Sequence, residues 1–168
     1  IASPRGSANY TNRLVGGSNA YHTKVVTGDL NGDGLPDAIT VNGGLIGDNA
    51  RIYLNQGNGS FLEQAVGTPG DSGRYQQVAL ADFDGDGSLD AFLIGSFVEF
   101  WRNDGAGNFS INQIPSPSYF AQFISVGDFN QDGAMDVFAC GTDFSTTVID
   151  SKGNTVNPSV IWVWFNDG

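Results

Sequence analysis

Cysteine, histidine and basic side chains are scarce in this sequence. Its 168 residues include a single cysteine, Cys140, a single histidine, His22, and 7 Lys and Arg residues against 18 Asp and Glu residues. One cysteine excludes an internal disulfide. The formal charge of −11 argues against nucleic acid or an anionic membrane as a partner, because both attract clustered Lys and Arg.

Long apolar runs are missing as well. No stretch approaches the roughly 20 apolar residues of a membrane span, and the first residues lack the basic start and apolar centre of a signal peptide. We therefore expect a soluble chain without membrane insertion, from which any export signal has been removed. With 40% hydrophobic residues, 24 glycines and 12% aromatics, the composition predicts one all-β domain of short strands and tight turns.

One acidic block occurs three times. Residues 28–37, 81–90 and 127–136 align without a gap, and their first aspartates are 53 and 46 residues apart. That distance is typical of a four-stranded propeller blade and is too long for a single hairpin. Of the 18 acidic residues, 16 are Asp, a short residue that suits turns and ligates hard cations.

Apolar segments around each block predict strands. The first strands are expected at 21–27, 75–80 and 120–126, the second at 38–41, 91–94 and 137–140, and the third at 52–57, 100–105 and 164–168. Fourth strands are expected at 60–63 and 108–111. The third copy lacks one, and residues 6–13 align with 57–64 and 105–112. A projecting hairpin or loop is expected at 142–159, where the third copy carries a polar insertion.

The predicted architecture is a single propeller segment over residues 1–168. Repeat 1 spans about 17–66, repeat 2 about 71–114 and repeat 3 about 118–168, and strand 6–14 of the same or another copy completes the last blade. Known rings use about four to eight blades, so three do not close alone. Three arrangements stay open: a dimeric ring, a head-to-tail filament, or a piece of a longer propeller.

Each acidic loop has the ligand pattern of a calcium site. Oxygen-bearing side chains alternate along the loop, and a glycine at position six permits a sharp bend. Positions one, three, five and nine supply side chains and position seven a backbone carbonyl: Asp29, Asn31, Asp33, Leu35 and Asp37; Asp82, Asp84, Asp86, Ser88 and Asp90; Asp128, Asn130, Asp132, Ala134 and Asp136. Oxygen ligands without His or Cys nearby favour Ca²⁺ over Zn²⁺, so three Ca²⁺ ions are expected. An EF-hand is excluded, since position twelve is Thr40, Leu93 or Ala139 instead of Glu.

These loops, each followed by a tail similar to Asn-x-Gly-x-Gly-x-Phe, resemble the FG-GAP/VCBS repeats of integrin α-subunit propellers and of many secreted bacterial and fungal proteins. The resemblance implies a β-propeller with Ca²⁺ in loops between strands and an extracellular location. It also implies a role in adhesion, in binding carbohydrate or protein, or in scaffolding, with self-association through the terminal strand.

Catalytic patterns are sparse, and we expect no enzyme. His22 occupies a strand position that is Gln76 in the second copy, so an ordinary strand residue is the preferred interpretation. Some polysaccharide lyases resemble a calcium propeller, and Lys24, Arg74 and Tyr75 would be candidates for that chemistry. The three tryptophans fall in apolar strands and are expected in the core, although they are also suited to stacking on sugars. They are Trp101, Trp162 and Trp164.

Overall fold

The computed structural model describes residues 11–15, 22–42, 50–66, 75–95, 97–115 and 119–168. Within these ranges the secondary structure consists of strands, turns and bends without a helix, which confirms the all-β prediction. Accordingly, none of these residues belongs to a helix long and apolar enough to cross a membrane.

The first and second repeats each form a four-stranded antiparallel sheet with the strands in sequence order. The first sheet contains β1 (His22–Gly28), β2 (Asp37–Asn42), β3 (Ala50–Asn55) and β4 (Phe61–Val66). The second sheet contains β5 (Tyr75–Ala81), β6 (Asp90–Gly95), β7 (Val98–Asn103) and β8 (Phe109–Ile114). The strands expected from the sequence are therefore confirmed in both repeats, within a few residues at each end.

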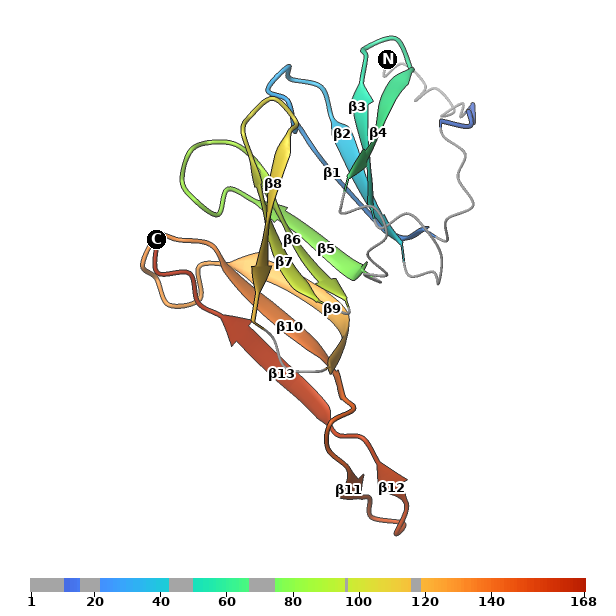
Figure 1. Cartoon of the computed structure of the whole chain (residues 1–168), viewed down its shortest axis with the longest axis vertical. Coiled ribbons are helices and arrows are strands. Elements are labelled where there is room, and N and C mark those ends of the chain that lie inside the picture. Colours follow the sequence, from blue (N-terminus) through green and yellow to red (C-terminus); the bar gives the residue numbers. More distant parts are fainter. Residues whose placement is uncertain (1–10, 16–21, 43–49, 67–74, 96, 116–118) are drawn as a thin grey trace, which may run out of the picture.

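The third repeat forms a sheet of three strands in the described part of the chain. It contains β9 (Tyr119–Gly127), β10 (Asp136–Asp143) and β13 (Ser159–Trp164), in the order β13-β10-β9. The polar insertion forms a separate two-stranded hairpin, β11 (Val148–Ile149) and β12 (Thr155–Val156). This hairpin projects from the body of the protein (Figure 1), as the insertion predicted.

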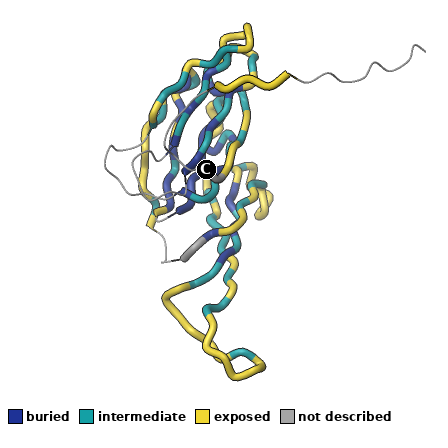
Figure 2. The backbone as a smooth tube through the Cα atoms, turned by 90° about the vertical axis from the view of Figure 1, so that its right-hand side faces the viewer, coloured by how far each residue is buried: buried dark blue, intermediate teal, exposed yellow. Residues whose placement is uncertain are grey.

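Alternating side chains join the three sheets. In β6 all six residues are buried, because successive side chains point to opposite faces and both faces are covered. Ala91 and Leu93 belong to a core shared with the first sheet, whereas Phe92 and Ile94 belong to a core shared with the third. In Figure 2 the buried residues lie in the body of the protein, while the projecting hairpin is mostly exposed.

One strand predicted in the third repeat needs correction. The last strand of the third repeat was expected at 164–168, but β13 pairs with β10 over Ser159–Trp164 and ends at Trp164. The prediction was anchored on the turn motif at 164–168. In the structure this motif follows the strand instead of forming part of it. Cys140 is half-buried in β10, because that face of the third sheet has no sheet packed against it in the described residues.

The proposed completing strand at 6–14 lies mostly outside the described residues. Residues 11–15 are described, are exposed and belong to no strand. Arg13 donates from Nη1 to the carbonyl of Gly59 at 3.0 Å, in the turn between β3 and β4. This part of the chain therefore contacts the first sheet, and completion of the third sheet stays a prediction.

Candidate metal sites

The three acidic loops connect the first and second strands of each sheet. They run from the end of β1 to β2, from β5 to β6 and from β9 to β10, and Figure 1 shows them along one edge of the stacked sheets. Repetition of the same strand pair thus brings the same loop to the same edge three times. The expected ligand residues are all among the described residues.

The position-one aspartate closes each loop around itself. Asp29 accepts from the N–H of Gly32 at Oδ1 (2.8 Å) and from the N–H of Gly34 at Oδ2 (2.8 Å). Asp82 makes the same pair of contacts with the N–H groups of Gly85 and Gly87, at 2.8 and 3.0 Å. Side chains that accept backbone N–H groups in this way hold a turn in shape without a helix or a ladder.

The third loop repeats one of these two contacts and differs in one backbone position. Asp128 accepts from the N–H of Gly133 at 3.0 Å. Where the other loops have Gly32 and Gly85 with φ of 74° and 75°, the third has Gln131 with φ of 64°. A side chain in this left-handed region is strained, because its Cβ approaches the backbone. The backbone of the third loop is therefore the most strained of the three at this position.

The position-nine aspartates are completely buried and join the loop to the end of the third strand. Asp90 accepts from the N–H of Phe83 at 3.1 Å and from the N–H of Asn103 at 2.8 Å. The matching acceptors in the other repeats are Asp37, bonded by Leu30 (2.9 Å) and Asn55 (2.7 Å), and Asp136, bonded by Phe129 and Asn166 (2.8 Å each). Each carboxylate keeps unused lone pairs, so these bonds leave capacity for a metal ligand.

The pKa values of two buried aspartates move in opposite directions. Burial, reinforced by the charges of Asp84 and Asp86, raises the pKa of Asp90. The N–H of Asn166 is the main cause that lowers the pKa of Asp136. The difference follows the stacking order, because Asp90 lies in the sheet that is covered on both faces.

The second loop brings three carboxylates together. Oxygen atoms of Asp82, Asp84 and Asp86 lie within 4.8 Å of one another. Ca²⁺ binds oxygen at 2.3–2.6 Å, so ligands around one ion are separated by up to about 5 Å. The cluster therefore fits a hard divalent cation with oxygen ligands. The first and third loops have an amide at position three, and Asn31 and Asn130 donate to the position-five carboxylates of their loops.

An arginine that the sequence patterns did not single out pairs with this cluster. Arg102 of β7 forms ion pairs with Asp84, from Nε, and with Asp86, from Nη2 at 3.6 Å. Hydrogen bonds from Ser88 and then the charge of Arg102 lower the pKa of Asp86. Arg102 directly precedes Asn103, and the residues that precede the matching Asn55 and Asn166 in the other repeats are Leu54 and Phe165. The second loop thus has its own counter-charge.

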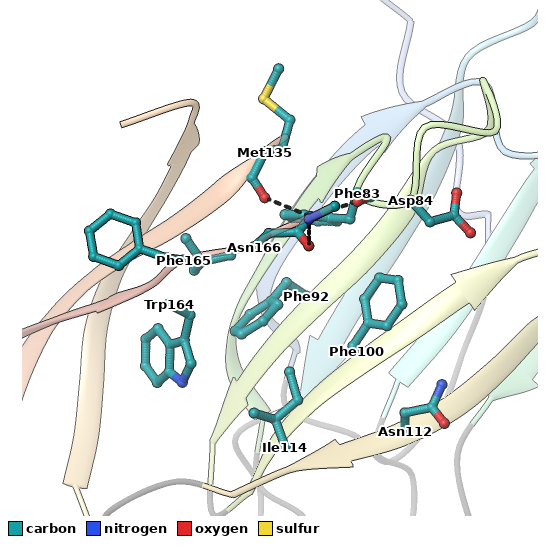
Figure 3. Close-up of a pocket in the computed structure, with 12 residues that line it drawn as sticks. Phe83, Asp84, Phe92, Phe100, Asn112, Ile114, Met135, Trp164, Phe165 and Asn166 are labelled. Atoms are coloured by element: carbon teal, nitrogen blue, oxygen red, sulfur yellow. Dashed lines mark hydrogen bonds between the residues drawn. The ribbon is translucent and has the colours of Figure 1, made fainter. Parts of the chain in front are cut away.

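Asparagines at the ends of the third strands connect the first and second loops to the sheet of the following repeat. Asn103 donates from Nδ2 to the carbonyl of Leu30 in the first loop, at 2.8 Å. Asn166 donates in the same way to the carbonyl of Phe83 in the second loop, at 2.6 Å, as drawn in Figure 3. The sequence shows the repeated Asn, but it does not show that its amide reaches the preceding repeat.

The residues considered for catalysis and sugar binding differ in burial. His22 and Lys24 are exposed on β1, and Arg74 lies outside the described residues. Tyr75 is buried, and its hydroxyl donates a hydrogen bond to the carboxylate of Glu99 at 2.6 Å. The indole N–H of Trp101 donates to the same carboxylate at 2.7 Å. The core prediction is confirmed for Trp101, which is completely buried. Two tryptophans are half-buried against the second core, namely Trp162 and Trp164.

Comparison with known proteins agrees with the repeat seen in the loops. The family model of the FG-GAP-like repeat matches residues 29–93 and 95–139, more than half of the chain, and the matched ranges contain all three acidic loops. No curated protein matches the chain. The repeated loop, the antiparallel sheets and this match lead to one assignment: the chain belongs to the FG-GAP-like repeat family, which suggests a β-propeller-like module.

Proposed function

We propose that this chain is an extracellular calcium-binding module that presents a propeller-type surface to a carbohydrate or protein, and that it is not an enzyme. The observation that carries the proposal is the threefold loop, with its position-one carboxylate held by backbone N–H groups and its three clustered carboxylates in the second copy. One such loop is an ordinary turn. Three loops with the same ligand pattern on one edge favour a shared function, the binding of a cation.

The donor set favours calcium among the common divalent cations. Each loop offers carboxylate or amide oxygens at four positions and a carbonyl at a fifth, and its nine positions contain no His or Cys. Ca²⁺ accepts six to eight such ligands with flexible geometry, whereas Mg²⁺ retains more of its water. Three Ca²⁺ ions would change the formal charge from −11 to −5 and relieve repulsion among the loop carboxylates.

An extracellular location suits this donor set. Extracellular calcium modules bind with Kd on the order of 10⁻⁴–10⁻³ M, which matches the calcium concentration outside cells better than that in the cytosol, and we expect these loops to bind in that range. The near-absence of cysteine is compatible with export.

Calorimetric titration and thermal unfolding test the calcium proposal together. A site that binds only the folded state stabilises it by about 2.7 kcal/mol when calcium is at 100 times its Kd. We expect the melting temperature to fall sharply in EDTA and to recover with Ca²⁺. Asp84→Asn is a matched control, because the other loops already have Asn at that position, whereas Asp82→Asn removes the position-one charge. Equal melting curves in calcium and chelator would overturn the proposal.

The projecting hairpin supports a binding role. Phe144, Val148 and Ile149 are exposed at 61%, 46% and 67%, on an insertion that the other two repeats lack. Exposed apolar side chains on an insertion favour recognition of a partner. A glycan array and a panel of purified extracellular matrix proteins should give binding that depends on calcium and weakens when residues 144–157 are replaced by a Gly-Ser turn. Turnover of a polysaccharide by the purified chain would instead favour an enzyme.

A structural role in self-assembly is the second candidate. In the described residues β13 pairs only with β10, whereas β4 and β8 cover the corresponding edge in the other sheets. Open edges of this kind recruit further strands. Exchange of the terminal strand between copies would give a ring or a filament, and electron microscopy distinguishes discs from fibres. A monomeric mass at high concentration in calcium would argue against this role.

A further inference from the structure

An apolar groove of about 360 Å³ lies between the second and third sheets. Its walls include Phe92, Phe100 and Ile114 from the second sheet and Trp164 from the third, with Asn166 at one end (Figure 3). Aromatic rings thus face the groove from both sides, while Asn112 adds a polar group to its lining. The groove is suited to a ring that is apolar on its faces and polar at its tip.

The corresponding place between the first and second sheets is filled by Phe109. Its ring packs against Trp101, with 6.3 Å between ring centroids, and joins the first core. Trp101 and Trp164 occupy equivalent positions in their sheets. Trp101 lies opposite Ala91 and Trp164 lies opposite Val137, and Ala91 and Val137 each directly follow the position-nine aspartate of their loop. The groove is therefore the place of a fourth-strand aromatic ring in the third sheet.

The backbone next to the groove is also prepared for a strand. Phe61 lies opposite Asn55 in the first sheet, and Phe109 lies opposite Asn103 in the second. The third sheet has the matching Asn166, but β13 ends at Trp164 and has no strand partner on this side in the described residues. One extended segment would thus gain ladder hydrogen bonds along β13 and an aromatic site beside it.

We propose that residues 6–14 of a second copy occupy this place, with the ring of Tyr10 in the groove. The proposal rests on the strand exchange proposed above and specifies its receptor. The alignment of residues 6–13 with 57–64 and 105–112 puts Tyr10 at the position of Phe61 and Phe109. Residues 6–10 lie outside the described part of the chain, so this assignment comes from the sequence pattern and the groove together.

A contact of Arg13 favours a second copy as the donor of the strand. Arg13 donates to Gly59 in the first sheet, whereas the groove is formed by the second and third sheets. The described end of the segment therefore lies at the first sheet of its own chain and not at its own groove, which favours a second copy as the donor. The phenol of Tyr10 would meet Asn112, which β8 contributes to the lining.

Sedimentation of the full chain in calcium tests the aromatic site. We expect association of the unaltered chain, a loss of roughly thirtyfold in affinity for Tyr10→Ala, and little change for Tyr10→Phe, because truncation of a buried anchor ring at an interface has an effect of that size. A chain that stays monomeric would contradict both the strand exchange and its receptor. Association that Tyr10→Ala leaves unchanged would overturn the receptor alone.

Disulfide trapping tests the register and the second copy. By analogy with Ser110 opposite Arg102 and Leu62 opposite Leu54, Thr11 should lie opposite Phe165. Two single-cysteine chains, Thr11→Cys and Phe165→Cys, are mixed in a Cys140→Ser background. Opposed residues of paired strands lie close enough for a disulfide.

The mixture can link only between copies, and we expect a covalent dimer under oxidising conditions. Val163→Cys in place of Phe165→Cys is the control, because it is two residues out of register and should link much more slowly. An absent dimer, or equal yields from both pairs, would overturn the proposed arrangement.

Discussion

The side-chain amide of Asn103 donates to the backbone carbonyl of Leu30, a residue 73 positions earlier, at 2.8 Å. The bond ties the end of β7 to the acidic loop of the preceding sheet, and Asn103 is almost completely buried. The same amide also donates to the carbonyl of Leu89, at 3.0 Å, in its own sheet. Asn103 thus connects two neighbouring repeats and the base of a candidate metal loop.

Loss of this bond should destabilise the protein. We expect Asn103→Ala to lower the free energy of unfolding by about 2–3 kcal/mol, because it leaves the buried carbonyl of Leu30 and the partly buried carbonyl of Leu89 without this donor. Asn55→Ala is the matched control: Asn55 makes the equivalent turn contacts, but its amide donates only to Pro36 of the same sheet among the described contacts. Urea unfolding measures both variants, and equal losses would show that the contact between sheets contributes nothing.

A glycine at position 131 should stabilise the third loop. Gln131 has φ of 64°, where Gly32 and Gly85 occupy the matching positions of the other loops. Relief of the left-handed strain predicts a gain of about 1 kcal/mol for Gln131→Gly, offset in part by the greater freedom of glycine in the unfolded chain. The reciprocal variant Gly85→Gln should lose a similar amount. Thermal unfolding at a fixed calcium concentration checks the pair, and a destabilised Gln131→Gly would refute the argument.

Removal of the arginine beside the second loop should strengthen cation binding there. Arg102 pairs with Asp84 and Asp86, so an incoming cation has to displace a positive charge. We expect Arg102→Leu, which copies Leu54 of the first sheet, to raise the calcium affinity of this loop about five- to tenfold, in line with a partly solvated charge at a few ångströms. Arg102→Lys keeps the charge and serves as control. Unchanged calorimetric titrations for Arg102→Leu would speak against a cation in this loop.

The projecting hairpin should open in acid. Asp150 accepts from the N–H groups of Asn154 (2.9 Å) and Lys152 (2.8 Å), and chiefly the bond from Asn154 lowers its pKa below the ordinary value of 3.8. Because the pKa of Asp150 is lower in the folded state, the ionised carboxylate stabilises the folded hairpin above pH 3.8. This stabilisation is lost as the pH falls through the lower folded-state pKa.

The amide resonances of Lys152 and Asn154 should therefore titrate with a midpoint below 3.8. Asp150→Asn removes the ionisable group, and its amides should keep one chemical shift through this pH range. A midpoint above 3.8 in the unaltered chain would contradict the prediction.

The repeat made most of the fold predictable. Eleven strand segments were expected within the repeats, besides the completing strand at 6–14. The first-strand and second-strand segments were confirmed in all three repeats because acidic turns bound each one. The end of the third repeat was misplaced, since an insertion separates β10 from β13 and the aligned turn motif no longer measures where the strand begins. Pattern spacing is informative only where the connecting segments have equal lengths.

The ligand pattern of the candidate metal loops was predictable, but the contacts that hold the loops in place were not. Alternating oxygen side chains identify the loops, but the sequence gives no sign that Asp37, Asp90 and Asp136 also hold the third strands in place. Arg102 was missed because it lies 16 residues after Asp86 and reaches the loop only through the pairing of β6 with β7. Contacts that depend on which sheet packs on which are not encoded in local spacing.

The complete burial of β6 has a consequence for how this protein opens. A strand that shares side chains with two cores cannot be released until both neighbouring sheets have moved away, whereas the outer sheets each lose a single interface. Amide protons of β6 should thus exchange only in global unfolding, and those of β4 should exchange through smaller fluctuations. The middle repeat sets the kinetic lifetime of the whole stack.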